Sequence, residues 1–223
     1  MSTLPDPPVA PPGSAWIAPD VHAVAIDDDL VFLEAHGDYR CLVDVAQRLR
    51  LHAERRIDAS PEDIEALVAA GLVSRSTATL AMPPPPKPTK DLAWTERALR
   101  GREIVAAAAA IAHTRDAMRP RSLRHLLRIA RAAAPVTPPR PQHELLDAAA
   151  AFARARPWMP IGGECLVRSF LMLTYLRRLG FDADWVIGVR TWPFRAHCWL
   201  QAGDVALDDD AERLVAYTPM VRA

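Results

Sequence analysis

The stretch "IGGECLVRSFLMLTYLRRLG", from Ile161 to Gly180, decides how the C-terminal half of the chain folds. From Cys165 onward its apolar residues recur at helical spacing, and Gly180 is a typical stop signal after a helix. We therefore expect a helix that begins at Cys165, after a glycine pair that lets the backbone turn tightly. The buried stripe of this helix is expected to contain Leu166, Phe170, Leu173, Leu176 and Leu179.

A cysteine at the start of a helix has a distinct chemistry. Unpaired N–H groups and the positive end of the helix dipole both favour the thiolate form of Cys165. The backbone N–H of the same residue is a natural donor to an oxyanion, although a second donor is not identified by the sequence. A structural cysteine also suits this position, so a nucleophile is indicated only if the thiol has a base nearby.

A candidate base lies in the stretch "FRAHCWLQAGDVALDDD", Phe194 to Asp210. Strands are predicted at residues 183–190, 196–201 and 204–210. Because side chains alternate along a strand, only one of His197 and Cys198 is expected to face the helix terminus. If it is His197, the imidazole can act as general base, oriented by an acid on the next strand: Asp208, Asp209 or Asp210. The other two cysteines are expected to be small core residues: Cys41 and Cys198.

Together these stretches resemble the B protein of lasso peptide biosynthesis, a transglutaminase-like cysteine protease, over about Ile161 to Pro219. The matches to its cysteine and histidine motifs are Cys165, Leu166, Arg168, Ser169, Pro193, Phe194, Ala196, His197 and Trp199. The resemblance implies a triad of Cys165, His197 and Asp209, the aspartate closing a Leu-x-Asp pattern. Two departures are Cys198, where the family commonly has alanine, and the additional Asp210, which keeps the choice of aspartate open.

The N-terminal segment shows three short apolar runs, at residues 22–26, 30–35 and 38–43, which we interpret as strands. A helix is predicted at about Val45 to Arg55. A second one follows Ser60 as N-cap and Pro61, and it ends at Gly71. Three strands followed by helices are the outline of a small winged-helix-like module.

This module resembles the leader-binding RiPP recognition element, in which a leader peptide adds as a strand beside the third strand and packs against the last helix. The resemblance implies a docking edge at about Tyr39 to Val43. The expected leader-binding residues are Tyr39, Cys41, Leu42, Val43, Ile64, Leu67 and Val68, although a plain core role stays open for each.

Proline clusters set the expected domain boundaries. Residues 1–20 are predicted to be a disordered tail, 21–80 the leader-binding module, 81–90 a stiff connector and 91–223 the protease domain.

Helices are predicted in the protease domain at residues 92–112, 123–133 and 144–154. Four arginines at helical spacing, one just before the second helix and three within it, fall on one face, which is either a solvated surface or a docking site: Arg121, Arg124, Arg128 and Arg131. The expected fold class is α+β, with a papain/transglutaminase-like second domain.

The composition and the motifs that are absent argue against several classes of function. Lys+Arg and Asp+Glu balance at 27 each, which argues against a dedicated nucleic-acid binder, and three cysteines do not make a disulfide framework. No signal peptide is evident in the sequence, and it shows no bilayer-length apolar run, no metal-ligand spacing and no phosphate loop, so we expect a cytoplasmic protein without cofactor.

The resemblance implies a leader peptidase that cleaves a lasso precursor and passes the core to an asparagine-synthetase-like cyclase, which consumes the ATP. Two alternatives stay open. One is acyl transfer to an amine by the same triad, and the other is a non-enzymatic winged-helix regulator that binds nucleic acid.

Overall fold

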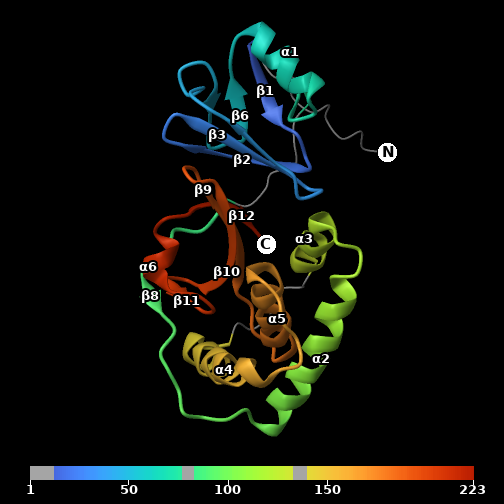
Figure 1. The fold of residues 1–223 in the computed structure, drawn as a ribbon, viewed down its shortest axis with the longest axis vertical. Coiled ribbons are helices and arrows are strands. Elements are labelled where there is room, and N and C mark those ends of the chain that lie inside the picture. The colour runs from blue at the N-terminus through green and yellow to red at the C-terminus, as the bar shows by residue number, and fades with distance from the viewer. Residues whose placement is uncertain (1–12, 77–82, 133–139) are drawn as a thin grey trace, which may run out of the picture. The chain divides into compact units, whose positions relative to one another are not determined.

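The computed structural model describes residues 13–76, 83–132 and 140–223, and the chain divides into two compact units, Met1–Pro83 and Pro84–Ala223 (Figure 1). The described part of the first unit contains more strand than helix. The second unit combines helices with one five-stranded sheet.

Two antiparallel sheets and one helix form the first unit. One sheet has the order β2-β3-β4 and the other β5-β6-β1-β7. Their shared core includes Ile17, Phe32, Ile57 and Ile64, all almost fully buried. The elements are β1 (Ser14–Ile17), β2 (Val21–Ile26), β3 (Asp29–Glu34), β4 (Tyr39–Leu42), β5 (Arg50–Leu51), β6 (Arg56–Asp58), α1 (Pro61–Ala69) and β7 (Val73–Ser74).

Helix α1 begins and ends where the sequence predicts. The Ser60 hydroxyl accepts the backbone N–H of Asp63 at 3.1 Å, Pro61 occupies the first turn, and Gly71 follows the helix at φ +73°. The cap and the positive φ satisfy the backbone groups that a helix leaves unpaired at its ends. The helix packs against β1 and β7 of the four-stranded sheet.

Two predictions for this unit are wrong. No helix forms at residues 45–55: Asp44 and Arg55 have φ of +54° and +64°, and between them a turn leads into β5. The turn buries Val45 and Leu49 in the core, and the Arg55 guanidinium donates to the carbonyl oxygens of Ala18 and Val21. Tertiary packing therefore outweighs the local helical preference.

The predicted disordered tail is also wrong from residue 13 onward, and its first twelve residues lie outside the described ones. Ser14–Ile17 form β1, which lies between β6 and β7 in the four-stranded sheet. Its residues Ala15 and Ile17 belong to the core. The described part of the first unit thus holds seven strands and one helix instead of three strands followed by helices.

The second unit places a five-stranded sheet, in the order β12-β9-β10-β11-β8, against helices. Helix α5 packs on β9 and β10 and contacts α2 and α4 (Figure 1). The elements are β8 (Lys90–Asp91), α2 (Gly101–Ala117), α3 (Leu123–Arg131), α4 (Gln142–Ala155), the 3-10 helix η1 (Arg156–Trp158), α5 (Cys165–Arg178), β9 (Asp184–Arg190), β10 (Arg195–Ala202), β11 (Val205–Ala206), α6 (Ala211–Leu214) and β12 (Thr218–Arg222).

Helix α5 begins at Cys165, as predicted, but it is buried on most sides instead of along one stripe. Its middle is enclosed from Ser169 to Leu173, whereas the predicted stripe residues Leu166 and Leu179 are only partly buried. The Ser169 hydroxyl accepts the indole N–H of Trp185 at 2.8 Å, which ties the helix to β9. This central position fixes the helix N-terminus against the sheet.

The other predicted helices are present with shifted ends. Helix α2 starts at Gly101 instead of Leu92, because the Glu103 carboxylate accepts the backbone N–H of Arg100 and pairs with the Arg97 guanidinium. Of the predicted basic face on α3, Arg121 precedes the helix at φ +49°, and Arg128 donates to His125. The end of that predicted helix, at residue 133, lies outside the described residues.

The second half of the predicted connector lies along the sheet of the second unit. Lys90–Asp91 form β8, parallel to β11, and the Thr89 N–H donates to the Asp204 carbonyl at 2.8 Å. The side-chain amide of Gln201 donates to the carbonyl oxygens of Pro86 and Gly203, and its oxygen accepts the Trp199 indole N–H. These bonds make the segment from Pro86 onward part of this unit.

Replacing Gln201 tests this attachment. Gln201→Ala leaves the buried Trp199 N–H without an acceptor and frees the Pro86 carbonyl, so we expect a loss of about 1–3 kcal/mol in the free energy of unfolding. Urea denaturation measures it. The control Lys90→Ala, which removes a solvent-exposed ion pair with Asp204, is expected to leave the midpoint unchanged; an equal loss in both variants contradicts the assignment.

Candidate active site

Cys165 is held at the first position of α5 by the turn before it. Gly163 has φ +153°, and a Cβ there would lie 2.6 Å from the Cβ of Val167, closer than real contacts allow. Gly162 has open space at the same point. Only the second glycine of the pair is therefore required for the approach of the chain to the helix. The backbone N–H of Cys165 is one of the N-terminal groups that have no acceptor within the helix.

His197 lies on β10, opposite Gly188 of β9, and it is only 6% exposed. Its Nε2 is 2.5 Å from Oδ2 of Asp209, and its ring packs against Tyr217 with centroids 5.1 Å apart. The ring also hydrogen-bonds the Cys165 thiol. Since the Nε2 atom of His197 bonds Asp209, the hydrogen bond to the Cys165 sulfur is made by Nδ1. The structure thus brings the three predicted catalytic residues into one hydrogen-bonded chain.

Of the three consecutive aspartates, Asp209 is the one that meets the histidine. The Asp208 carboxylate instead accepts the backbone N–H of Leu200 at 2.8 Å. Asp210 is exposed and stands at the N-cap of α6. The predicted strand at 204–210 is too long, because β11 ends at Ala206. The Leu207 N–H still donates to the Leu200 carbonyl oxygen, and the Asp208 side chain then accepts the Leu200 N–H in place of a backbone carbonyl.

Arg168 is a site residue that sequence reasoning missed. One helical turn after Cys165, its guanidinium donates to Oδ2 of Asp209 at 2.7 Å and lies 3.3 Å from Oδ2 of Asp208. It therefore ties the helix that carries the cysteine to the acids that orient the histidine. Its place in the matched Cys-Leu-x-Arg-Ser motif was the available signal, but the sequence did not show which partner it has.

The electrostatics of the site favour an ion pair. Hydrogen bonds from the Cys198 thiol, then from His197, then from the Cys198 backbone lower the pKa of Cys165 to about 4. Burial lowers the pKa of His197, but the hydrogen bonds to Asp209 and Cys165 outweigh it and raise the pKa to about 9. A thiolate and an imidazolium therefore coexist at neutral pH, with apparent values that belong to the pair.

The two aspartates differ in charge behaviour. Burial raises the pKa of Asp209, yet hydrogen bonds from His197 and the Asp210 N–H, with the charge of Arg168, hold it well below its usual range. Burial raises the pKa of Asp208 to about 6, against the opposing Leu200 N–H and Arg168. Asp209 thus stays ionised whenever it faces the imidazolium.

The expectation that only one of His197 and Cys198 reaches the helix terminus is wrong. Cys198 is buried, as predicted, but its thiol and its backbone N–H both hydrogen-bond the Cys165 sulfur. The N–H groups of residues 198 and 200 point to the same edge of β10, and β11 pairs only with its last residues, Gln201 and Ala202. The sulfur lies at this open edge, where side chains from both faces reach it.

The predicted leader-binding residues lie in the first unit. β4 is the edge strand of its sheet, and Val43, which follows it, is 46% exposed; Tyr39, Cys41 and Leu42 are partly buried. Leu42 and Val68 pack against the core that contains Ile64 and Leu67. These last two are buried, so a core role accounts for both.

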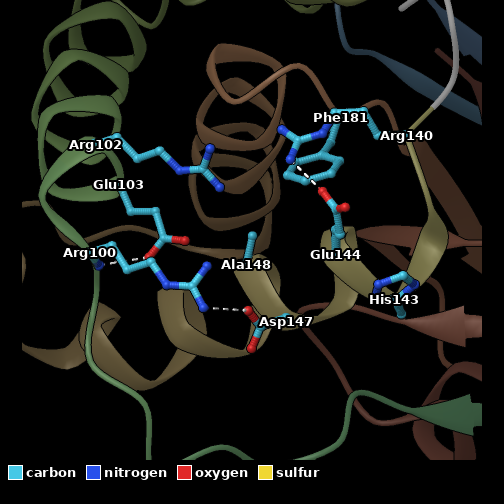
Figure 2. A pocket seen from close by; sticks show the side chains of 9 residues that line it. All are labelled: Arg100, Arg102, Glu103, Arg140, His143, Glu144, Asp147, Ala148 and Phe181. Carbon is cyan, nitrogen blue, oxygen red and sulfur yellow. Dashed lines mark hydrogen bonds and ion pairs between the residues drawn. The ribbon is translucent and has the colours of Figure 1, made fainter.

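A cavity of about 480 Å³ lies elsewhere in the second unit and contains none of the predicted catalytic residues (Figure 2). Its charged residues largely pair with each other: Arg140 with Glu144, and Arg100 with Asp147. Its lining is Arg100, Arg102, Glu103, Arg140, His143, Glu144, Asp147, Ala148 and Phe181.

The family profile described as transglutaminase-like superfamily matches residues 111–222, half of the chain, and the protein belongs to this superfamily. The match contains the helix of Cys165 and the strand of His197. Neither a curated protein nor a solved structure matches the chain. Within the described residues, no helix is long and apolar enough to cross a membrane.

The two glycines before Cys165 offer a matched pair of variants. Gly163→Ala forces a Cβ onto Val167 and is expected to displace Cys165 from His197, whereas Gly162→Ala is expected to be neutral. The alkylation rate of Cys165 by iodoacetamide at pH 6 reports the thiolate: we expect a roughly tenfold or greater loss for Gly163→Ala, because an ordinary thiol has a pKa of about 8.5. Equal rates in both variants would contradict this account of the turn.

Proposed function

We propose that this protein is a cysteine peptidase that removes the leader from a lasso precursor peptide. The observation that carries the proposal is the hydrogen-bonded chain from Cys165 through His197 to Asp209 in a transglutaminase-like domain. The motifs around these residues, which resemble the lasso B protein, give the substrate class.

In the proposed mechanism, the Cys165 thiolate attacks the scissile carbonyl carbon, and the Cys165 N–H donates to the oxyanion. The His197 imidazolium gives its proton to the leaving amine as the C–N bond breaks, which leaves a thioester. The leaving amine is the N-terminus of the core, so the thioester holds the leader. Neutral His197 then takes a proton from water, which attacks the thioester and releases the leader as a free acid and Cys165 as the thiolate. Asp209 holds the ring through Nε2 in both steps.

The first unit binds the leader in this proposal. Among the described strands, β4 lies at the edge of its sheet, and an extended peptide can add beside an edge strand by β-augmentation. Val43, which is exposed, and Tyr39, which is partly buried, are the side chains proposed to contact the peptide there. Ile64 and Leu67 support the site from the core instead of touching the peptide.

The released core then passes to an asparagine-synthetase-like cyclase, which supplies the ATP-dependent step. Acyl transfer to an amine uses the same triad and differs only in the acceptor. Product mass separates the two reactions, because hydrolysis adds water and transfer adds the amine.

Cleavage of a precursor peptide by aspartate variants tests the catalytic assignment. Asp209→Ala leaves the imidazole without its orienting partner and is expected to lower kcat/KM by roughly 10²- to 10⁴-fold. Asp210→Ala is the matched control, because this exposed residue is expected to matter little. A loss of kcat/KM in Asp210→Ala alone would overturn the choice of Asp209. A product that carries an added amine would show that the reaction is acyl transfer and not hydrolysis.

Leader binding tests the edge strand. Val43→Asp places a charge at the proposed docking edge and is expected to weaken leader affinity about tenfold or more, whereas Val105→Asp on α2, 70% exposed, is the control and is expected to bind normally. Isothermal titration with the leader peptide measures both. If the two variants bind equally well, the leader site is not at this edge.

A further inference from the structure

The proposed mechanism leaves one thiol at the site without a role. Cys198 is 7% exposed, and its sulfur lies within hydrogen-bonding reach of the Cys165 sulfur, from the neighbouring strand β10. Cys165 itself is only partly buried. The pair therefore consists of one partly exposed cysteine and one enclosed cysteine.

The two sulfurs differ in charge as well as in exposure. Cys165 is a thiolate at neutral pH, whereas the hydrogen bond to Cys165, then burial, raise the pKa of Cys198 well above its ordinary value and keep it a thiol. Arg168 and Asp208 are the charged groups that also act on Cys198. An accessible thiolate is the form of cysteine that peroxides oxidise, and a neighbouring thiol is what resolves the product.

We propose that Cys198 is a resolving cysteine: when a peroxide oxidises Cys165, the two residues form a reversible disulfide that shuts the active site off and protects its nucleophile. The inference rests on Cys165 being the reactive thiol of the proposed function, but not on the identity of the peptide substrate.

The reaction proceeds in two balanced steps. The Cys165 thiolate attacks one oxygen of hydrogen peroxide, an S–O bond forms, the O–O bond breaks and hydroxide leaves; sulfur is oxidised and peroxide is reduced. The Cys198 sulfur then attacks the Cys165 sulfur, an S–S bond forms and the S–O bond breaks. The Cys198 proton leaves with the hydroxyl group as water. A cellular dithiol or glutathione reduces the Cys165–Cys198 disulfide back to the two thiols by thiol–disulfide exchange.

The neighbouring thiol matters because the competing reaction is irreversible. A sulfenic acid that meets more peroxide becomes a sulfinic acid, which ordinary thiols do not reduce. Contact between the two sulfurs in the folded protein gives the internal attack a large advantage over a second peroxide from solution. A chain with alanine in place of Cys198 lacks this protection.

The test treats the reduced full-length protein with hydrogen peroxide and maps its peptides by mass spectrometry. We expect a Cys165–Cys198 crosslinked peptide whose mass is two hydrogens below the sum of the two separate peptides. We also expect Cys165 to lose its reactivity toward alkylation, and dithiothreitol to restore that reactivity. Cys41→Ala controls for thiol number and is expected to give the same crosslink.

In Cys198→Ala, and in Cys198→Ser as a second replacement, Cys165 is expected to gain two or three oxygens, and dithiothreitol is expected to leave its alkylation blocked. Wild-type protein that accumulates sulfinic acid without the crosslink overturns the inference, and this measurement needs no variant to fold. This experiment measures thiol chemistry and does not depend on precursor cleavage. If the crosslink forms in a protein that cleaves no precursor, the redox proposal is supported and only the peptidase proposal is rejected.

Discussion

The contact between the N-terminus of α5 and the open edge of β10 is the constraint on which the site depends. α5 is enclosed by the sheet and by α2 and α4, so its first residue has a fixed position relative to the strand. β11 pairs only with the end of β10, which leaves the backbone N–H of Cys198 free to meet the Cys165 sulfur. Gly163 makes the approach possible, since a side chain there would collide with Val167.

A line of alternating charge extends from this contact into the protein. The thiolate of Cys165 faces the imidazolium of His197, which faces the carboxylate of Asp209, which in turn faces the guanidinium of Arg168. Each of these groups is at least half removed from water, and burying an unpaired charge is costly. Removing any one member therefore affects the protonation of the next, which is why Arg168, without touching the sulfur, belongs to the same unit as the nucleophile.

The sequence predicts the helix at Cys165 and the strand at His197 well, because a glycine pair, helical periodicity and matched motifs are local signals. Three consecutive aspartates stayed open in the sequence, and only the fold shows that Asp209 is the one beside His197. Prediction from the sequence fails where contacts between distant residues determine the local structure. Positive φ at Asp44 and Arg55 cannot be read from neighbouring residues, and they replace a predicted helix with a turn and a strand. The contact of Cys198 with Cys165 was missed for a related reason: alternation gives the direction of a side chain but not the position of a sulfur beside the strand edge.

The protonation state of His197 tests the central claim, the thiolate–imidazolium pair, most directly. Nuclear magnetic resonance of ring-labelled histidine measures it across pH without any substrate. The account predicts that the ring stays protonated until pH rises through about 9, and that Cys165→Ala lowers this pKa because the hydrogen bond and charge of the thiolate are lost. A wild-type ring that loses its proton near the ordinary value of about 6.5, unchanged in Cys165→Ala, would contradict it.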